Sequence, residues 1–202
     1  EIARVEIPGK KGTTVVDTDE GPRKDTTLDV LAKLRPAFPG KDPKATDLSV
    51  TAGNASSLND GAAALVVVSE NYAEGHGLEI LGRVTGYATG GTAPEDLFFA
   101  PIVAVRNLMK KVGTKIGDYD LIEANEAFAS QALANGAELG WDWNKVNVNG
   151  GAIALGHPIG ASGARVLTTL LYAMKSRGAQ RGLATLCLGG GDAVALSVER
   201  AD

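Results

Sequence analysis

The amino-acid sequence predicts an α/β fold, in which helices cover a sheet on both faces. From residue 79 onward, strand-like and helix-like segments alternate along the chain, which is typical of layered α/β domains. Residues 62–68 form an unbroken apolar run, and such runs are typical of strands that are buried on both faces. These two observations together favour a sheet enclosed between layers of helices.

The first part of the chain is charged and rich in turn-forming residues. Residues 1–47 contain Gly and Pro breaks, for example at 10–12 and 39–40, so we expect a partly irregular surface region. Within it, residues 27–34 place three leucines at intervals of three, which favours one or two helical turns.

A change in composition follows this region. Residues 48–52 read as a strand, residues 53–61 as a polar loop and residues 62–68 as a buried strand. We therefore predict a division into residues 1–47, 48–80 and 81–202, in which the middle part ends one domain and the last part forms another.

The remaining elements follow from the spacing of apolar residues. The clearest is a helix after residue 160, where four apolar residues fall at i, i+3, i+4 and i+7 before a stop at Gly178. The others are a strand at 79–89, a helix at 101–112, a short strand at 120–124, a helix at 127–139, and strands at 146–148, 183–187 and 193–198.

Composition excludes several classes of protein. The 202 residues carry a net charge of −4 without a basic cluster, which argues against nucleic acid as a partner. The apolar runs are shorter than the roughly 20 residues that cross a bilayer, so we expect no membrane span. With Cys187 as the single cysteine and two histidines, we expect no disulfide, no metal site and a reducing, cytoplasmic compartment. Because the chain begins at Glu1, it is interpreted as a piece of a longer protein.

Three segments place reactive side chains at the ends of predicted elements. They are residues 125–128, 156–163 and 187–191. Loops at the carboxyl ends of strands in open α/β sheets are where sites gather. The glycine spacing in residues 156–163 matches neither a dinucleotide fingerprint nor a P-loop. The sequence therefore favours one site that does not bind phosphate through this loop.

Each candidate side chain has a functional and a structural interpretation. A neutral His157 could accept a thiol proton, or could be a loop histidine bonded to a carbonyl. Cys187 could be an inert thiol at a strand end, or could act beside the backbone N–H groups of the glycines that follow it. Asn125 could donate to a water or carbonyl, or could cap a helix.

The motifs resemble those of the thiolase family, and within it the biosynthetic enzymes that condense acetyl-CoA. The resemblance rests on residues 125–129 (Asn-Glu-Ala-Phe-Ala), the long block at 147–163, and residues 187–191 (Cys-Leu-Gly-Gly-Gly). Residues 33–38 and 50–56 also look like that family. The resemblance runs nearly from end to end.

The resemblance implies a fold and a division of labour. It implies the α/β/α/β/α layered sandwich of thiolases, here as the C-terminal core domain with the end of the N-terminal half. Residues 1–47 would end the loop domain that binds CoA. Thiolases carry their nucleophilic cysteine in the N-terminal half, so we expect that half as a missing partner. The completed enzyme is expected to be a homodimer or homotetramer.

The resemblance also implies roles. His157 would activate the nucleophile, Cys187 would remove a methyl proton from the second acetyl-CoA, and Asn125 would hold a water that polarises its carbonyl. The N–H of Gly189 would join an oxyanion hole. CoA contacts would come from four further positions: Arg23, Ala52, Ser56 and Phe128.

The chemistry implied is condensation of two acetyl-CoA to acetoacetyl-CoA and CoA, or its thiolytic reverse, with coenzyme A thioesters as substrates and no cofactor. Two alternatives stay open: a degradative 3-ketoacyl-CoA thiolase that accepts longer chains, and a noncatalytic acyl-CoA-binding subunit. Ser57 and Val30 depart from the family pattern near the CoA contacts, which bears on affinity more than on reaction type.

Overall fold

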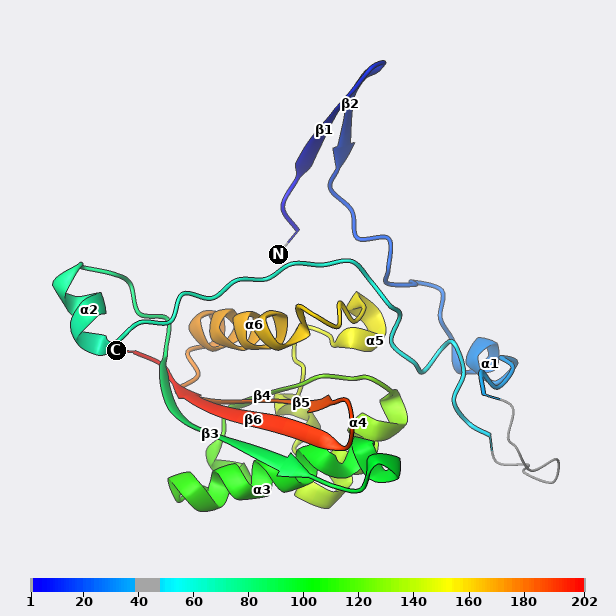
Figure 1. Ribbon diagram of the computed structural model, residues 1–202. Helices are drawn as coiled ribbons and strands as arrows, with labels where there is room; N and C mark the ends of the chain where they lie inside the picture. Colours follow the sequence, from blue (N-terminus) through cyan, green and yellow to red (C-terminus); the bar gives the residue numbers. More distant parts are fainter. Residues whose placement is uncertain (1, 39–47, 202) are drawn as a thin grey trace.

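A four-stranded mixed sheet forms the centre of the molecule (Figure 1). The computed structural model describes residues 2–38 and 48–201. The strands lie in the order β3 (Arg83–Gly91), β6 (Asp192–Glu199), β5 (Arg181–Leu188) and β4 (Leu121–Ala124). The β4–β5 pair is parallel, whereas β6 is antiparallel to both of its neighbours.

Helices cover both faces of this sheet (Figure 1). On one face lie α3 (Ala100–Val112) and α4 (Ala129–Leu139), and on the other lies α6 (Ser162–Arg177), with the short α5 (Ala152–Leu155) beside its N-terminal end. Short 3₁₀ turns complete the connections: η1 (Pro94–Phe99), η2 (Ile116–Asp118) and η3 (Trp143–Lys145).

Apolar side chains that point alternately to the two faces of the central strands explain why helices cover both faces of the sheet. In β4, Leu121 packs into the cluster beneath α6 and Ile122 into the cluster against α3. In β5, Leu183 and Ala184 divide between the same two clusters. Successive side chains of a strand point to opposite faces, so apolar neighbours require two helical layers. The predicted enclosed sheet is confirmed.

The predicted helices and most strands of this domain are also confirmed. Elements α3, α4 and α6 match the predicted ranges 101–112, 127–139 and the helix after residue 160. The last helix ends at Gly178 in the left-handed conformation with a φ of 67°, as its stop signal predicts.

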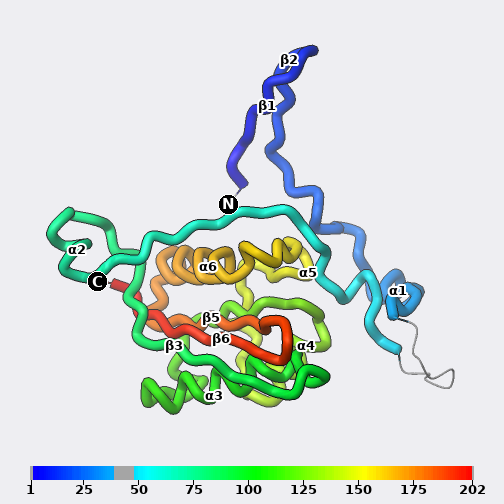
Figure 2. Tube along the Cα trace, in the orientation of Figure 1, coloured from blue at the N-terminus to red at the C-terminus, as the bar shows by residue number. Residues whose placement is uncertain are grey.

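The N-terminal region is more regular than predicted. It contains a two-stranded hairpin, β1 (Val5–Gly9) with β2 (Gly12–Val16), which extends away from the sheet domain (Figures 1 and 2). The predicted helical turn appears as α1 (Leu28–Leu31), capped by Thr27. The predicted turn at 39–40 and the domain boundary at residue 47 lie outside the described residues.

The strand predictions for residues 48–52 and 62–68 were wrong. Thr51 makes an isolated bridge with Pro36, and residues 62–68 run extended past α6 (Figure 2) without a paired strand in the part of the chain that the structure describes. Val66 and Val67 are 87% and 80% exposed. An apolar run indicates that a segment favours burial, but a strand also needs a neighbouring strand for its hydrogen bonds. The helix α2 (Glu70–Gly75) follows this run.

The predicted strand at 146–148 was also wrong. Val146 makes a single parallel bridge with Ile122, and Asn147 then turns the chain with a φ of 46°. That left-handed conformation is one that Asn tolerates, and it ends strand pairing after one residue. Among the described residues, the structure contains no helix long and apolar enough to cross a membrane.

The starts of the parallel strands β4 and β5 are joined through Asp120. Its Oδ2 accepts hydrogen bonds from the backbone N of Gln180 at 2.8 Å and of Arg181 at 3.0 Å. The bond from Arg181 is the largest cause that holds the pKa of Asp120 below its ordinary value of 3.8. Because its native pKa is lowered, the carboxylate stabilises the fold above pH 3.8, and this contribution is lost as pH falls through the native value.

We predict that Asp120→Ala lowers the free energy of unfolding by about 1 kcal/mol near neutral pH, since two charge-assisted but solvent-exposed hydrogen bonds are lost. The difference from the unsubstituted chain should shrink as pH falls below 3.8. Urea unfolding at several pH values measures it, with the exposed Glu95→Ala as the control variant. A difference that persists unchanged in acid would contradict this role for Asp120.

Candidate active site

Asn125 lies directly after β4, at the carboxyl edge of the sheet, and is only 1% exposed. Its backbone N donates to the carbonyl of Thr185 on the parallel strand β5 at 3.0 Å. Its side-chain Nδ2 lies 3.4 Å from Nε2 of His157, and its Oδ1 is buried without a hydrogen-bond partner. The sheet therefore holds a buried amide against the imidazole, and the amide oxygen retains an unused acceptor.

The side chain of Asn147 closes the end of β4. Its Oδ1 accepts from the N of Ala124, and its Nδ2 donates to the O of Ala124, both at 2.8 Å. The same Nδ2 donates to Oε1 of Glu126 at 2.7 Å, and Oε2 of Glu126 accepts from the N of Ile153 at 3.1 Å. The loop that carries Asn125 is thereby tied to the segment that leads to His157.

Two glycines are required in this segment. A Cβ at Gly151 would lie 2.2 Å from the carboxyl carbon of Glu126. Gly156 has a φ of 93°, and a Cβ there would lie 2.2 Å from the side chain of Asn59. A larger residue at either position would displace the groups that hold the loops together.

His157 is held through its backbone and through its ring. Its backbone N donates to the carbonyl of Ser57 at 2.8 Å. Its Nδ1 lies 2.6 Å from Oγ of Ser162, the first residue of α6, and that Oγ lies 3.0 Å from the carbonyl of Pro158. His157 thus lies just ahead of the helix that the sequence predicts after residue 160.

Residues 54–58 join the loops of Asn125 and His157. The N and Oγ of Ser56 donate to the carbonyl of Ala127 at 3.2 and 3.0 Å, and the N of Ala129 donates to the O of Asn54 at 2.8 Å. Leu58 forms a parallel bridge with His157. The predicted residues Ser56 and His157 are thus brought together by one extended segment.

Charge and burial favour the neutral form of His157. Burial, and secondarily the positive charge of Arg165, lower the pKa of this imidazole below its ordinary value of 6.5. Arg165 itself is positioned by Glu123 on β4, whose carboxylate is 2% exposed and lies 3.7 Å from the guanidinium. At neutral pH the ring is therefore unprotonated and competent to accept a proton.

Cys187 and Gly189 lie at the same edge of the sheet as Asn125. In the parallel register the last pair is Ala124 with Thr185, so Cys187 lies two residues beyond the end of the pairing between β4 and β5. Burial raises the pKa of the half-buried Cys187 thiol. In the described residues, no hydrogen bond joins Cys187 to Asn125 or His157. Gly189 is exposed in the turn between β5 and β6.

The four residues that are predicted to contact CoA lie on three separate segments of the chain. Phe128 lies in the loop after Asn125, bridges to Ala55, and packs edge-to-face with Phe98 at a centroid distance of 5.1 Å. Ala52 is exposed in the turn before Ser56. Arg23 is exposed and lies two residues after Gly21, where an added Cβ would be 3.1 Å from the O of Ala154 in α5.

Sequence reasoning did not single out Asn147, Ser162 or Arg165 as parts of this site. Ser162 and Asn147 both belong to the long motif block at 147–163, so membership of that block could have pointed to them as site residues. Arg165 lies on the first turns of α6, and only its pairing with Glu123 reveals its electrostatic effect on the site.

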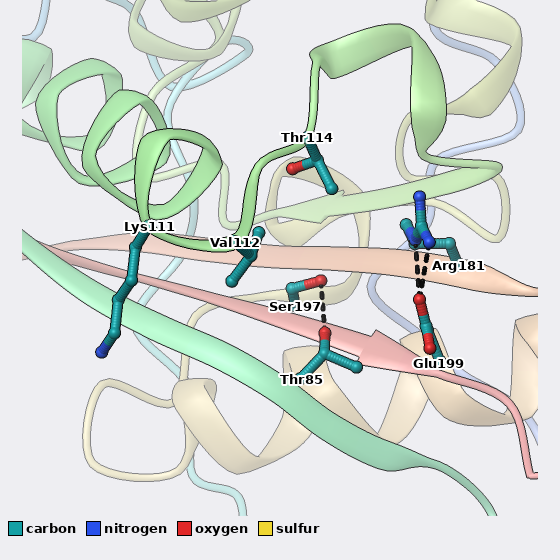
Figure 3. Close-up of a pocket in the computed structure, with 7 residues that line it drawn as sticks. All are labelled: Thr85, Lys111, Val112, Thr114, Arg181, Ser197 and Glu199. Carbon is teal, nitrogen blue, oxygen red and sulfur yellow. Dashed lines mark hydrogen bonds and ion pairs between the residues drawn. The ribbon is translucent and has the colours of Figure 1, made fainter.

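A separate cavity of about 280 Å³ lies beside the sheet between the end of α3 and strands β3, β5 and β6 (Figure 3). None of the predicted site residues lines it. Four of its polar side chains pair with one another, since Thr85 donates to Ser197 at 2.9 Å and Arg181 contacts Glu199 at 2.6 Å. Across the residues that the structure describes, His, Cys, Asp and Glu do not gather in a group of three that could hold a metal ion.

The chain is similar to thiolases along nearly its whole length. The family described as "Thiolase, C-terminal domain" matches residues 78–200, and "Thiolase, N-terminal domain" matches residues 1–71. The acetyl-CoA acetyltransferase of Shinella zoogloeoides is 56% identical over 199 residues, and that of Pseudomonas aeruginosa is 55% identical over 201 residues. These alignments cover 98% and 99% of the chain, but only 49% and 50% of the relatives.

Solved structures agree on the fold. The Bacillus anthracis acetyl-CoA acetyltransferase superposes with a TM-score of 0.90 at 46% identity, and human mitochondrial 3-ketoacyl-CoA thiolase with 0.86 at 39% identity. In each case 98% of the chain and 49% of the solved chain are covered. The predicted thiolase fold is confirmed, and the chain spans about half the length of the curated relatives it matches.

We predict that Arg165→Gln raises the pKa of His157 because it removes a nearby positive charge. The rise should recover only part of the difference from 6.5, since burial is the larger cause. NMR titration of the imidazole signals measures this, and Arg165→Lys, which keeps the charge, serves as the control. An unchanged or lower pKa in Arg165→Gln would show that Arg165 does not act on His157.

Proposed function

Because this chain belongs to the thiolase family, we propose that it supplies the C-terminal part of the active site of an acetyl-CoA acetyltransferase. The reaction is the condensation of two acetyl-CoA to acetoacetyl-CoA and CoA, or its thiolytic reverse. One observation carries the proposal: a neutral His157 lies against a buried Asn125 at the edge of the sheet. The names of the relatives support acetyl-CoA as the substrate.

His157 acts as the general base for the first half-reaction. We infer that the nucleophile is a cysteine outside these 202 residues, since the only cysteine here is Cys187. Nε2 takes the proton of that thiol, the thiolate attacks the thioester carbonyl, and CoA leaves as a thiol after it receives the same proton from His157. A thiol with an ordinary pKa near 8.5 is mostly protonated at neutral pH, so the step needs a base.

Cys187 and Asn125 serve the second half-reaction. Cys187, as a thiolate, takes a proton from the methyl group of the second acetyl-CoA. Its raised pKa makes that thiolate a strong base, although a scarce one at neutral pH. The enolate attacks the acyl-enzyme and releases the cysteine as a thiolate, which then receives the proton held by Cys187. The unpaired Oδ1 of Asn125 can accept from a water that in turn polarises the thioester carbonyl.

The oxyanion of the acyl-transfer steps is stabilised by a different group. The backbone N–H of Gly189 lies in an exposed turn and can donate to the developing oxyanion. Preorganised donors of this kind contribute about 3 to 4 kcal/mol to transition-state stabilisation. Separate donors suit separate steps, because the enolate and the tetrahedral oxyanion form at different carbonyls.

CoA approaches along the rim formed by Ser56, Phe128, Ala52 and Arg23. The hydroxyl of Ser56 already donates to Ala127, so its oxygen is left to accept a hydrogen bond from an amide of pantetheine. Arg23 is suited to the phosphates at the nucleotide end. Phe128 presents an aromatic wall to the acyl-pantetheine arm.

A degradative 3-ketoacyl-CoA thiolase is the second candidate, favoured by the likeness to the human mitochondrial enzyme. Acetyl-CoA acetyltransferase is preferred because the relatives of that name are the more similar in sequence. We further propose residues 1–47, 48–80 and 81–202 as the domain division, a cytoplasmic location, and a homodimer or homotetramer once the cysteine-bearing half is present.

Replacement of His157 by Ala should slow acylation of the nucleophilic cysteine about 10²- to 10⁴-fold in the enzyme completed with its N-terminal half, since the general base is lost. Rapid-quench mass spectrometry of the acyl-enzyme measures the rate. The matched control is His76→Ala, which changes the other histidine at the exposed end of α2. Acylation at the unsubstituted rate in His157→Ala would refute the role.

For Cys187→Ser we expect acylation to proceed while deuterium exchange at the acetyl-CoA methyl slows about 10²-fold or more, since a neutral hydroxyl is a far poorer base than a thiolate. Mass spectrometry follows both in the same completed enzyme. If exchange were normal and only thermal stability fell, Cys187 would be an ordinary buried thiol.

A further inference from the structure

Ser162 is the contact of His157 that the proposed mechanism does not use. It is fully buried, with 0% exposure, and occupies the first position of α6. Its Oγ lies 2.6 Å from Nδ1 of His157 and 3.0 Å from the carbonyl oxygen of Pro158. A buried hydroxyl between a ring nitrogen and a carbonyl has a defined direction of donation.

The direction follows from the number of protons. A serine hydroxyl has one proton to donate, and a carbonyl oxygen can only accept. The contact with Pro158 therefore uses the Ser162 proton, and Oγ is left to accept from His157. That requires the hydrogen of the neutral imidazole to be on Nδ1, which leaves a lone pair on Nε2.

The contact of Nε2, on the other side of the ring, is consistent with a hydrogen on Nδ1. Nε2 lies 3.4 Å from Nδ2 of Asn125, a group that can only donate. A lone pair on Nε2 is therefore matched by an N–H, whereas an N–H on Nε2 would meet another N–H. The opposite arrangement needs the Ser162 proton donated to Nδ1, a reversed Asn125 amide, and the oxygens of Ser162 and Pro158 3.0 Å apart with no hydrogen between them.

We propose that Ser162 is a positioning residue that fixes His157 in the Nδ1–H tautomer, so that Nε2 is available to take the thiol proton. The catalytic consequence rests on the proposed function, whereas the tautomer is a property of the chain itself. Free histidine carries its neutral-form proton mainly on Nε2, so the protein has to select the other form. Ser162 does so from the side of the ring opposite Asn125.

The tautomer is measured directly on the ¹⁵N-labelled chain by long-range ¹H–¹⁵N correlation NMR at about pH 8, where imidazole is neutral. The chain has two histidines, so His76 provides the internal reference. We expect a pyrrole-type shift for Nδ1 of His157 and a pyridine-type shift for Nε2. In Ser162→Ala the two shifts should move toward the opposite assignment, and Ser162→Thr, which keeps the hydroxyl, should restore them.

The amide spectrum of each variant shows whether it is folded. If Ser162→Ala does not fold, the shifts of the unsubstituted chain and of Ser162→Thr decide the question. A pyrrole-type Nε2 in the unsubstituted chain overturns the proposal, as does a folded Ser162→Ala with unaltered shifts.

A second arm separates this proposal from the proposed function. In the completed enzyme, Ser162→Ala should slow acylation about 10- to 100-fold, with recovery in Ser162→Thr. If the tautomer responds as expected but the unsubstituted enzyme does not acylate, the proposed function fails and the role of Ser162 in fixing the ring stands. If the unsubstituted enzyme acylates and folded Ser162→Ala does so at the same rate, Ser162 does not position the base.

Discussion

The side chain of Asn147 holds together the two loops on which the candidate site depends. One amide bonds both backbone groups of Ala124 at the end of β4 and also reaches Glu126. Through Glu126 the same network reaches Ile153 in α5. The position of Asn125 is therefore coupled to that of the segment leading to His157. Partly buried polar groups that satisfy one another in this way help to specify a single arrangement of the two loops.

The fold also places charged side chains near this edge of the sheet. Glu123 points from β4 toward α6, where it positions Arg165, and Arg165 in turn disfavours protonation of His157. A buried ion pair is weak evidence for stability, but here it places a positive charge beside a base that has to be neutral. The same strand thus carries Asn125 at its end and, through Glu123, influences the protonation of its partner.

The sequence was sufficient to predict those helices and site residues whose signal lies within one short stretch of the chain. The spacing of Leu167, Leu170, Leu171 and Met174 predicts α6, and the motif blocks predict that Asn125 and His157 share a site. It was insufficient where the structure of a segment depends on which other segment lies beside it. Residues 62–68 have strand-like composition but no paired strand among the described residues.

Asn147 shows the same limit within the site, because its positive φ and its contacts with Ala124 replace a predicted strand. Ser162 was also beyond the sequence, since its role depends on a hydroxyl placed between His157 and Pro158. Hydrogen-bond direction is a property of three-dimensional contacts. A motif can contain such a residue without revealing what it does.

We propose that the edge formed by residues 54–58, 125–128 and 156–162 receives the acyl-CoA. Titration of acetyl-CoA into the ¹⁵N-labelled chain tests it most directly, with amide and imidazole shifts read residue by residue and desulfo-CoA as the comparison ligand. We expect saturable shifts that concentrate on these segments, with Ser56, Asn125 and His157 among them. Shifts centred instead on the cavity of Thr85, Lys111 and Arg181, with this edge unaffected, would contradict it.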